Sequence, residues 1–277
     1  MKNIIIVFTK VPKVGDTKTR LTEKRGGILE PEEAMHLYEG LLLDVINASV
    51  AANCGEVKIC YNQSGDREYL EKLLSGVTHR DKIEDIYPDQ GGSFDECMQY
   101  ATDYVLKNGS KERLADSVIV VGGDLPSLQP GILQDVMKKI ERLAATDRGH
   151  AVALDCDAKR EENIGAALVE GACQEGGFSI IGYTCTTPFT FAGVFYNMTG
   201  VTTLDMTVNK AAEKKIPMAA CEMTPDIDIP IDLASMIPVL RVLELAAIDD
   251  ETIIAPVNTI RILNELGLES SSTPPQR

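Results

Sequence analysis

Basic side chains gather in a short segment near the start of the chain, and their types and spacing suit phosphate binding. After an apolar run, residues 10–21 read Lys10-Val11-Pro12-Lys13-Val14-Gly15-Asp16-Thr17-Lys18-Thr19-Arg20-Leu21. Gly15 lets the backbone approach a ligand closely, and Arg20 can grip two phosphate oxygens at once. Because Asp16 and Thr17 separate Gly15 from Lys18, the segment is not a Walker A loop. It predicts a phosphate-binding loop; surface ion pairs are the alternative for Lys18 and Arg20.

Carboxylates stand at two later places where a metal ion is expected. Asp124 follows the apolar segment 117–121 through Gly122 and Gly123, and an acidic, proline-flanked stretch spans 226–232. Mg²⁺ and Mn²⁺ take one or two carboxylates and fill their shells with phosphate oxygens and water. Asp124 could instead cap the following turn. In the later stretch Asp228 is either a ligand or part of a helix cap, and Asp232 is best placed as the cap.

The charge of the chain is unevenly distributed. Residues 1–25 hold seven basic and two acidic side chains, whereas the whole chain has a net charge of −15. Such an acidic protein is not expected to bind a nucleic-acid polymer, because that affinity comes from neutralising phosphates. A cationic island suits a small polyanion such as a nucleoside di- or triphosphate. On charge alone, a solvated basic loop is the alternative.

Composition predicts a globular, cytoplasmic protein. Hydrophobic residues make up 44% and charged residues 25% of the 277 residues, as in ordinary soluble domains. The apolar runs are too short to cross a bilayer, and the N-terminus lacks the features of a signal peptide. The seven cysteines are scattered and never spaced as Cys-x-x-Cys, which favours buried thiols in a reducing compartment. No arrangement of cysteine, serine or histidine predicts a covalent nucleophile, and His36, His79 and His150 show no partner pattern.

Strand and helix patterns alternate along most of the chain. Predicted strands cover residues 4–9, 57–61, 83–87, 117–121, 151–154, 178–183 and 218–223. Predicted helices begin at Pro31 and cover 67–74, 94–106, 132–143, 203–214, 233–245 and 259–266. A charged loop is expected over 155–163. This alternation predicts a mainly parallel sheet with helices on both faces, where ligands bind beyond the carboxyl ends of the strands. Both the segment 10–20 and Asp124 follow predicted strands.

Four motifs, in order, resemble one family. Lys10-x-Pro12-x-x-Gly15-x-x-Lys18-Thr19-Arg20-Leu21 closely resembles the opening of the glycosyltransferase-A-like, cofC-like uncharacterised transferases, which are related to phospholactate guanylyltransferase. The segments Gln90-Gly91-Gly92, Gly122-Gly123-Asp124-Leu125-Pro126 and 226–233 resemble later motifs of that family. The resemblance spans roughly residues 4–233. It implies the nucleotide-diphospho-sugar transferase fold, a GT-A-like, Rossmann-type α/β/α sandwich built on a mostly parallel sheet.

The resemblance also implies roles for individual residues. Lys18 and Asp124 would be catalytic, and Asp124 and Asp228 would hold Mg²⁺ or Mn²⁺. Nucleotide phosphates would be bound by Lys10, Gly15, Lys18, Thr19, Arg20, Gln90 and Gly91. The acceptor side would include Glu175, Gly176 and Gly177. In that last stretch Glu175 and Phe178 replace the family's aspartate and tyrosine, and residues 148–163 form a longer connection than the family's usual one.

Together these features predict a metal-dependent transferase. The domain is expected over residues 1–268, followed by a disordered tail over 269–277. Its donor would be a nucleoside triphosphate or a nucleotide sugar, its acceptor a small molecule, with neither nucleic acid nor membrane as partner; a homo-oligomer is compatible with the sequence. Nucleotidyl and glycosyl transfer remain open, because an attacking phosphate would need further cations on the acceptor side. A non-catalytic nucleotide-binding or regulatory module on the same fold is the alternative function.

Overall fold

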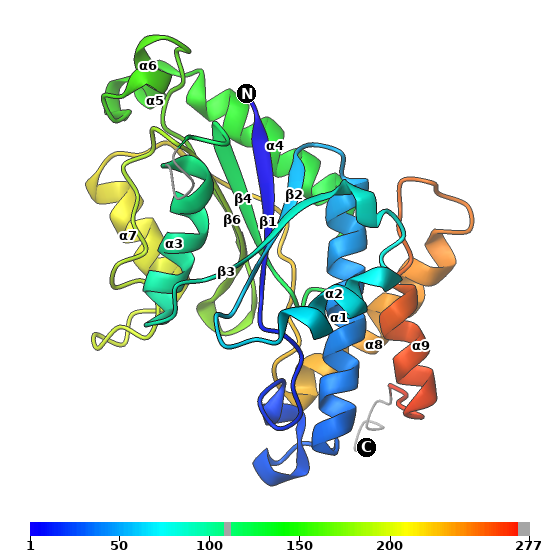
Figure 1. The fold of residues 1–277 in the computed structure, drawn as a ribbon. Helices are drawn as coiled ribbons and strands as arrows, with labels where there is room; N and C mark the ends of the chain where they lie inside the picture. The colour runs from blue at the N-terminus through cyan, green and yellow to red at the C-terminus, as the bar shows by residue number, and fades with distance from the viewer. Residues whose placement is uncertain (108–111, 271–277) are drawn as a thin grey trace, which may run out of the picture.

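A computed structural model of the chain describes residues 1–107 and 112–270. One seven-stranded sheet has the strand order β3-β2-β1-β4-β6-β5-β7 (Figure 1). Its strands are β1 (Asn3–Thr9), β2 (Glu56–Tyr61), β3 (Ile83–Pro88), β4 (Ser117–Gly122), β5 (Leu168–Ala172), β6 (Phe178–Thr184) and β7 (Met218–Ala220). The α-helices are α1 (Pro31–Ala51), α2 (Arg67–Leu73), α3 (Phe94–Leu106), α4 (Pro130–Ala144), α5 (Asp147–Val152), α6 (Asp157–Arg160), α7 (Thr203–Glu213), α8 (Pro230–Ala246) and α9 (Val257–Glu265). Most of the tail expected over 269–277 lies outside the described residues.

The sheet is mostly parallel, as the alternation of strand and helix patterns predicted. Strand β1 pairs in parallel with β2 and β4, and β2 with β3. Strand β6 runs antiparallel to both neighbours, β4 and β5. Because β1, β2, β3 and β4 run the same way, the loops that follow them meet at one edge of the sheet.

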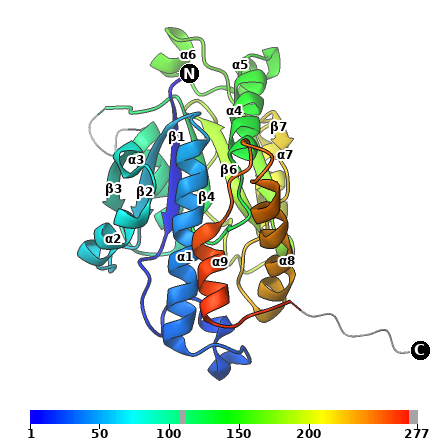
Figure 2. The ribbon, with the colours of Figure 1, turned by 90° about the vertical axis from the view of Figure 1, so that its right-hand side faces the viewer.

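Helices cover both faces of the sheet, which makes an α/β/α sandwich (Figure 2). The alternating side chains of β1 show why. Ile5 and Val7 belong to the core cluster that includes residues of α1 and α4, whereas Ile4 and Ile6 belong to the cluster that includes residues of α3. All four are 0% exposed, as expected for a central strand buried on both faces.

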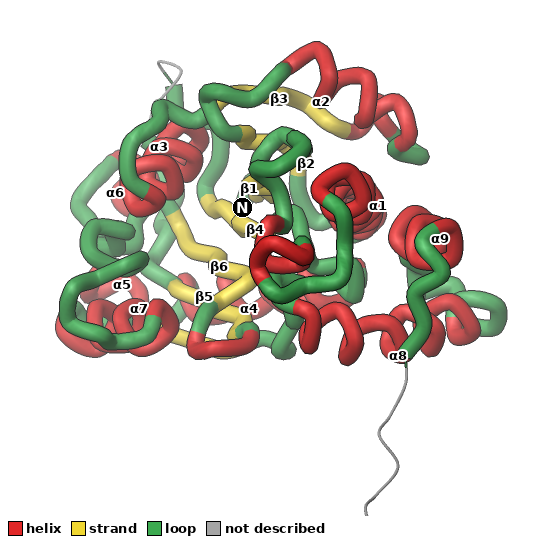
Figure 3. Tube along the Cα trace, turned by 90° about the horizontal axis from the view of Figure 1, so that it is seen from below, coloured by secondary structure: helices red, strands yellow, loops and turns green. Residues whose placement is uncertain are grey.

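Helices α8 and α9 add a third cluster outside α1. Leu37 and Leu41 of α1 pack there with Leu233 and Leu240 of α8 and with Ile262 of α9. Viewed from below, α9 lies beside α1, and α8 runs along the edge of the molecule next to them (Figure 3). Among the helices in the described part of the chain, none combines the length and apolar character needed to cross a membrane.

The strand predicted over 151–154 is wrong, and a real strand was missed. Residues up to Val152 belong to helix α5, whose N-cap residue Thr146 accepts a hydrogen bond from the Gly149 N–H. A short apolar run does not by itself distinguish strand from helix. The missed strand is β5, where buried Glu170 interrupts the apolar pattern. The predicted loop 155–163 also contains the short helix α6.

Candidate active site

A cleft of about 740 Å³ opens at the carboxyl ends of the parallel strands. It is lined by the segments that follow β1, β2, β3 and β4, by the start of β6, and by Asp226 and Asp228 in front of α8. Its position is the one expected for a ligand site in an open α/β sheet. The cleft therefore joins the two features that the sequence singled out, the basic loop and the carboxylates.

Lys18 is the centre of the cleft. Its backbone lies in the left-handed region, with φ 50°, a conformation that costs free energy for a residue with a side chain. The side chain is only 6% exposed, and Nζ lies 2.5 Å from Asp124 Oδ2 and 2.7 Å from Asp228 Oδ1. Nζ also lies 5.6 Å from the ring centroid of Tyr38, a cation–π contact. The basic loop is thus bent to direct one ammonium group inwards.

Electrostatics keeps this ammonium group charged. Burial alone would lower the pKa of Lys18, but the carboxylates of Asp124 and Asp228 outweigh burial and raise the pKa above its ordinary value. Burial likewise opposes ionisation of Asp228, yet Lys18 and then Arg20 lower the pKa of that carboxyl. The Arg20 guanidinium lies 3.4 Å from Asp228 Oδ2 and is largely exposed. Lys18 is therefore a permanent buried cation, and Arg20 a cation at the mouth of the cleft.

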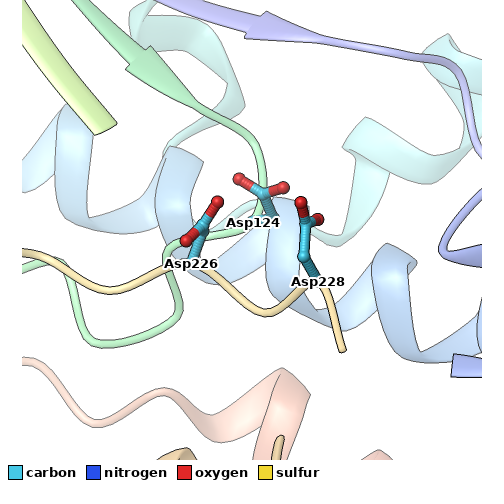
Figure 4. Close-up of side chains that lie close together, drawn as sticks. All are labelled: Asp124, Asp226 and Asp228. Atoms are coloured by element: carbon cyan, nitrogen blue, oxygen red, sulfur yellow. The ribbon is translucent and has the colours of Figure 1, made fainter. Parts of the chain in front are cut away.

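Three carboxylates face one another beside Lys18. Asp124 follows β4, and Asp226 and Asp228 lie on the extended segment before α8 (Figure 4). One oxygen from each lies within 4.8 Å of the others. Burial, and then repulsion from Asp124 and Asp228, raises the pKa of Asp226 to about 6. Among the described residues, these three carboxylates are paired with two cations, Lys18 and Arg20, which leaves an excess of negative charge.

The residues present fit a hard divalent cation. Mg²⁺ binds oxygen at 2.0–2.1 Å, so that ligand oxygens on opposite sides of the ion lie about 4.2 Å apart. One carboxylate oxygen from each of Asp124, Asp226 and Asp228 lies within 4.8 Å of the others, close to that spacing, and carboxylate oxygen is the donor that Mg²⁺ and Mn²⁺ prefer. Lys18 Nζ contacts the carboxylates of Asp124 and Asp228, so an ion bound there would use carboxylates that Lys18 also contacts.

The segment that carries Asp226 and Asp228 is held at both ends. Asp232 Oδ2 accepts hydrogen bonds from the backbone N–H groups of Asp228 and Ile229, which is the helix cap predicted for Asp232. Gln174 binds the other end: its Nε2 donates to the Asp226 carbonyl and its Oε1 accepts from the Asp226 N–H. These contacts fix the directions of both carboxylates.

The predicted phosphate-binding residues divide into two groups. Lys10, Thr19, Arg20 and Gly91 line the cleft with Lys18. Of the described residues, Gly15 and Gln90 are not among those that line it. Gly15 instead turns the loop, with φ +74°, and the Gln90 side chain donates to the Glu96 carbonyl at the start of α3.

The predicted acceptor-side residues lie beside the cleft. Glu175, with φ 57°, and Gly176 lie in the 3-10 turn between β5 and β6. Neither they nor Gly177 are among the described residues that line the cleft. From this turn it is Gln174 that contacts the carboxylate segment. The role of Glu175, Gly176 and Gly177 stays a prediction.

Sequence reasoning missed several residues of the cleft. Asp226 was not predicted as a ligand, although its spacing from Asp228 is a signal. In an extended segment residues two apart point the same way, and Ile227 between them is 0% exposed and packs into the core. The ends of β2 and β3 also contribute polar residues that no motif indicated: Asn62, Gln63, Ser64 and Asp89.

The fold, a mostly parallel sheet with helices on both faces, is also found in a solved structure. A crystal structure from Desulfovibrio desulfuricans G20, described as a putative nucleotide-diphospho-sugar transferase, matches with a TM-score of 0.69. The two chains are 20% identical, and the match covers 96% of each. At this identity the similarity establishes the fold and leaves the activity open.

Two further structures are more distant. A nucleotidyl transferase from Methanothermobacter thermautotroptrophicus has a TM-score of 0.46 and 12% identity, covering 86% of this chain and 98% of its own. A CMP:2-keto-3-deoxy-manno-octonic acid synthetase complexed with CTP has a TM-score of 0.43 and 12% identity. The match covers 88% of this chain and 100% of the synthetase chain. These TM-scores are below 0.5, and we draw nothing from them.

A family profile matches residues 45–198, more than half of the chain. The chain belongs to this family, described as uncharacterized protein conserved in bacteria (DUF2064). A comparison with proteins of curated function finds no match.

Proposed function

We propose that this protein is a metal-dependent transferase. Its donor is a nucleoside triphosphate or a nucleotide sugar, and it transfers a nucleotidyl or glycosyl group to a small acceptor. The observation that carries the proposal is the meeting of Asp124, Asp226 and Asp228 with Lys18 at the carboxyl ends of the parallel strands. A divalent cation on the carboxylates would offset the charge that builds up on the leaving phosphate.

The protein's own residues supply the rest of the donor site. Lys18 and Arg20 bring positive charge to the cleft, and Lys10 adds an exposed ammonium group at its edge. These cations bind the phosphates and stabilise the negative charge that develops as the donor bond breaks. The electron pair of that bond stays on the leaving phosphate oxygen, while an acceptor oxygen forms the new bond and releases its proton. No covalent protein intermediate is required.

Titration calorimetry with nucleoside diphosphates and triphosphates, with and without Mg²⁺, tests the donor site. We expect Mg²⁺ to strengthen binding, and we expect Asp124→Asn to remove that effect. Asp81→Asn is the matched control, because Asp81 is an exposed aspartate in a turn before β3. Binding that is indifferent to Mg²⁺ in the wild type would contradict the proposal.

Slow hydrolysis, with water as the acceptor, separates the two reactions. Glycosyl transfer to water releases a nucleoside diphosphate from a nucleotide sugar, whereas nucleotidyl transfer releases pyrophosphate from a nucleoside triphosphate. A non-catalytic nucleotide-binding module would bind nucleotide with Mg²⁺ and release neither product, in water or with any acceptor supplied.

A further inference from the structure

The cleft is chemically divided. The cations that line it, Lys10, Lys18 and Arg20, all come from the loop after β1. On the side of β6 and α3 the lining is apolar or uncharged and includes the rings of Phe94, Phe178 and Phe195. Of the described lining residues on that side, none is basic. A phosphate bound there would have no basic side chain to pair with.

The phenylalanine rings form one continuous wall. Phe94 lies edge-on to Phe8 and to Phe195, with centroid separations of 5.6 and 4.5 Å. Phe195 in turn lies 5.4 Å from Phe178. Phe94 is still 40% exposed, although it stands at the start of a helix that could have buried it. A large ring left exposed in a cleft is typical of a ligand-binding surface.

From these contacts we infer that the acceptor is an uncharged hydroxyl compound that lays an apolar ring face, such as that of a sugar or an aromatic alcohol, on this wall. The inference rests on the proposed function, and it names the substrate class for the second half of the cleft. An acceptor phosphate is disfavoured there because its desolvated charge would be unpaired. An apolar ring face gains dispersion and burial energy against phenyl rings.

Saturation-transfer NMR with two probe series tests the inference. The neutral probes are methyl and phenyl glycosides, and the charged probes are the corresponding sugar 1-phosphates, each with and without Mg²⁺ and a nucleoside diphosphate. We expect saturation transfer from the protein to the neutral probes, and we expect it to be strongest for the phenyl glycosides. Phe94→Ala should weaken it about three- to tenfold. Phe94→Leu keeps an apolar side chain without a ring, and it serves as the control for a general loss of structure.

Tyr196→Ala is the matched control. Its ring is 86% exposed, contacts Phe94 at 6.3 Å, and is not among the described lining residues. Transfer to sugar 1-phosphates alone, no transfer to any neutral probe, or an equal loss in Tyr196→Ala would overturn the inference. Nucleotide calorimetry stays independent of this readout, so failure of the donor site and failure of the aromatic wall are distinguishable.

Discussion

Lys18 and Asp124 are 106 residues apart in the chain, yet Lys18 Nζ lies 2.5 Å from Asp124 Oδ2. Asp124 is also one of the carboxylates suited to a divalent cation. A metal ion bound by Asp124 would therefore compete with the lysine ammonium for this carboxylate, although both cations favour bound phosphate. A substitution at Lys18 can therefore strengthen the binding of a metal ion and weaken the binding of nucleotide.

Replacing Lys18 by methionine should have opposite effects on the two ligands. Without nucleotide, Lys18→Met should bind Mn²⁺ more tightly than the wild type, because the ammonium no longer occupies the carboxylates. Nucleotide binding should weaken by about 1.5–3 kcal/mol, the usual loss for a hydrogen bond to a charged group. Electron paramagnetic resonance of free Mn²⁺ and calorimetry measure the two affinities. Lys24→Met is the control, since Lys24 is an exposed cation of the same basic segment. Weaker Mn²⁺ binding in Lys18→Met would contradict the competition.

Asp124→Asn should abolish the added thermal stability that Mg²⁺ gives to the nucleotide complex. Asparagine keeps the size of the side chain and its ability to cap a turn, but it lacks the charge needed to hold a hard dication. Thermal melting with nucleotide, with and without Mg²⁺, gives the answer, and Asp81→Asn should behave as the wild type. We expect Asp226→Asn and Asp228→Asn to show the same defect in smaller degree. A normal response to Mg²⁺ in all three variants would place the metal elsewhere.

Gln174→Ala should lower the affinity for Mg²⁺ and nucleotide about tenfold with little effect on the melting temperature. Its amide makes two hydrogen bonds to the backbone of Asp226 and so positions a carboxylate that it does not touch. Glu175→Ala, one residue further on, is exposed and serves as the comparison for donor binding. Equal affinities in Gln174→Ala and wild type would show that Asp226 is held without this contact. An acceptor-side role of Glu175 would appear only when an acceptor is supplied.

Glu170 should make the folded protein less stable as the pH rises. Burial raises the pKa of this carboxyl from 4.5 to about 8, partly offset by the hydrogen bond from Thr207. Its Oε2 atom is buried without a hydrogen-bond partner among the described residues. A folded-state pKa above the unfolded value means that stability is complete below about pH 4.5 and falls as the pH rises through the folded pKa near 8.

Glu170→Gln removes this dependence because the amide stays neutral. At about pH 9 the variant should be more stable than the wild type, by on the order of 3 kcal/mol, and at about pH 4.5 the two should be similar. Urea unfolding at both pH values measures the difference. Glu141→Gln, an exposed position on α4, is the control. A parallel pH dependence in Glu170→Gln and wild type would assign the effect to another group.

Local patterns in the sequence were sufficient for the elements with strong periodicity and for the basic loop. The continuous apolar run of β1 and the helical periods of α1 and α4 each arise from neighbouring residues, so the mainly parallel sheet could be predicted. The cations of residues 10–20 follow the first strand directly, so their location at the edge of the sheet could be predicted from the sequence. The helix cap formed by Asp232 could also be predicted, because it involves only residues close to Asp232 in the sequence.

Tertiary structure decided everything that depends on contacts between distant segments. Strand β5 escaped prediction because Glu170 is tolerated only where Thr207, from a helix far along the chain, binds it. Lys18 is a buried cation and not a surface one because it contacts Asp124 and Asp228. Asp124 reaches Lys18 because β4 pairs with β1, and Asp228 reaches it because the segment before α8 passes the end of the sheet. The division of the cleft into a cationic half and a phenyl half has the same origin, since Phe94 and Phe195 meet only after the chain has folded. Spacing along a sequence specifies which side chains share a face of one element, but the distance between two elements is set by the packing of the core between them.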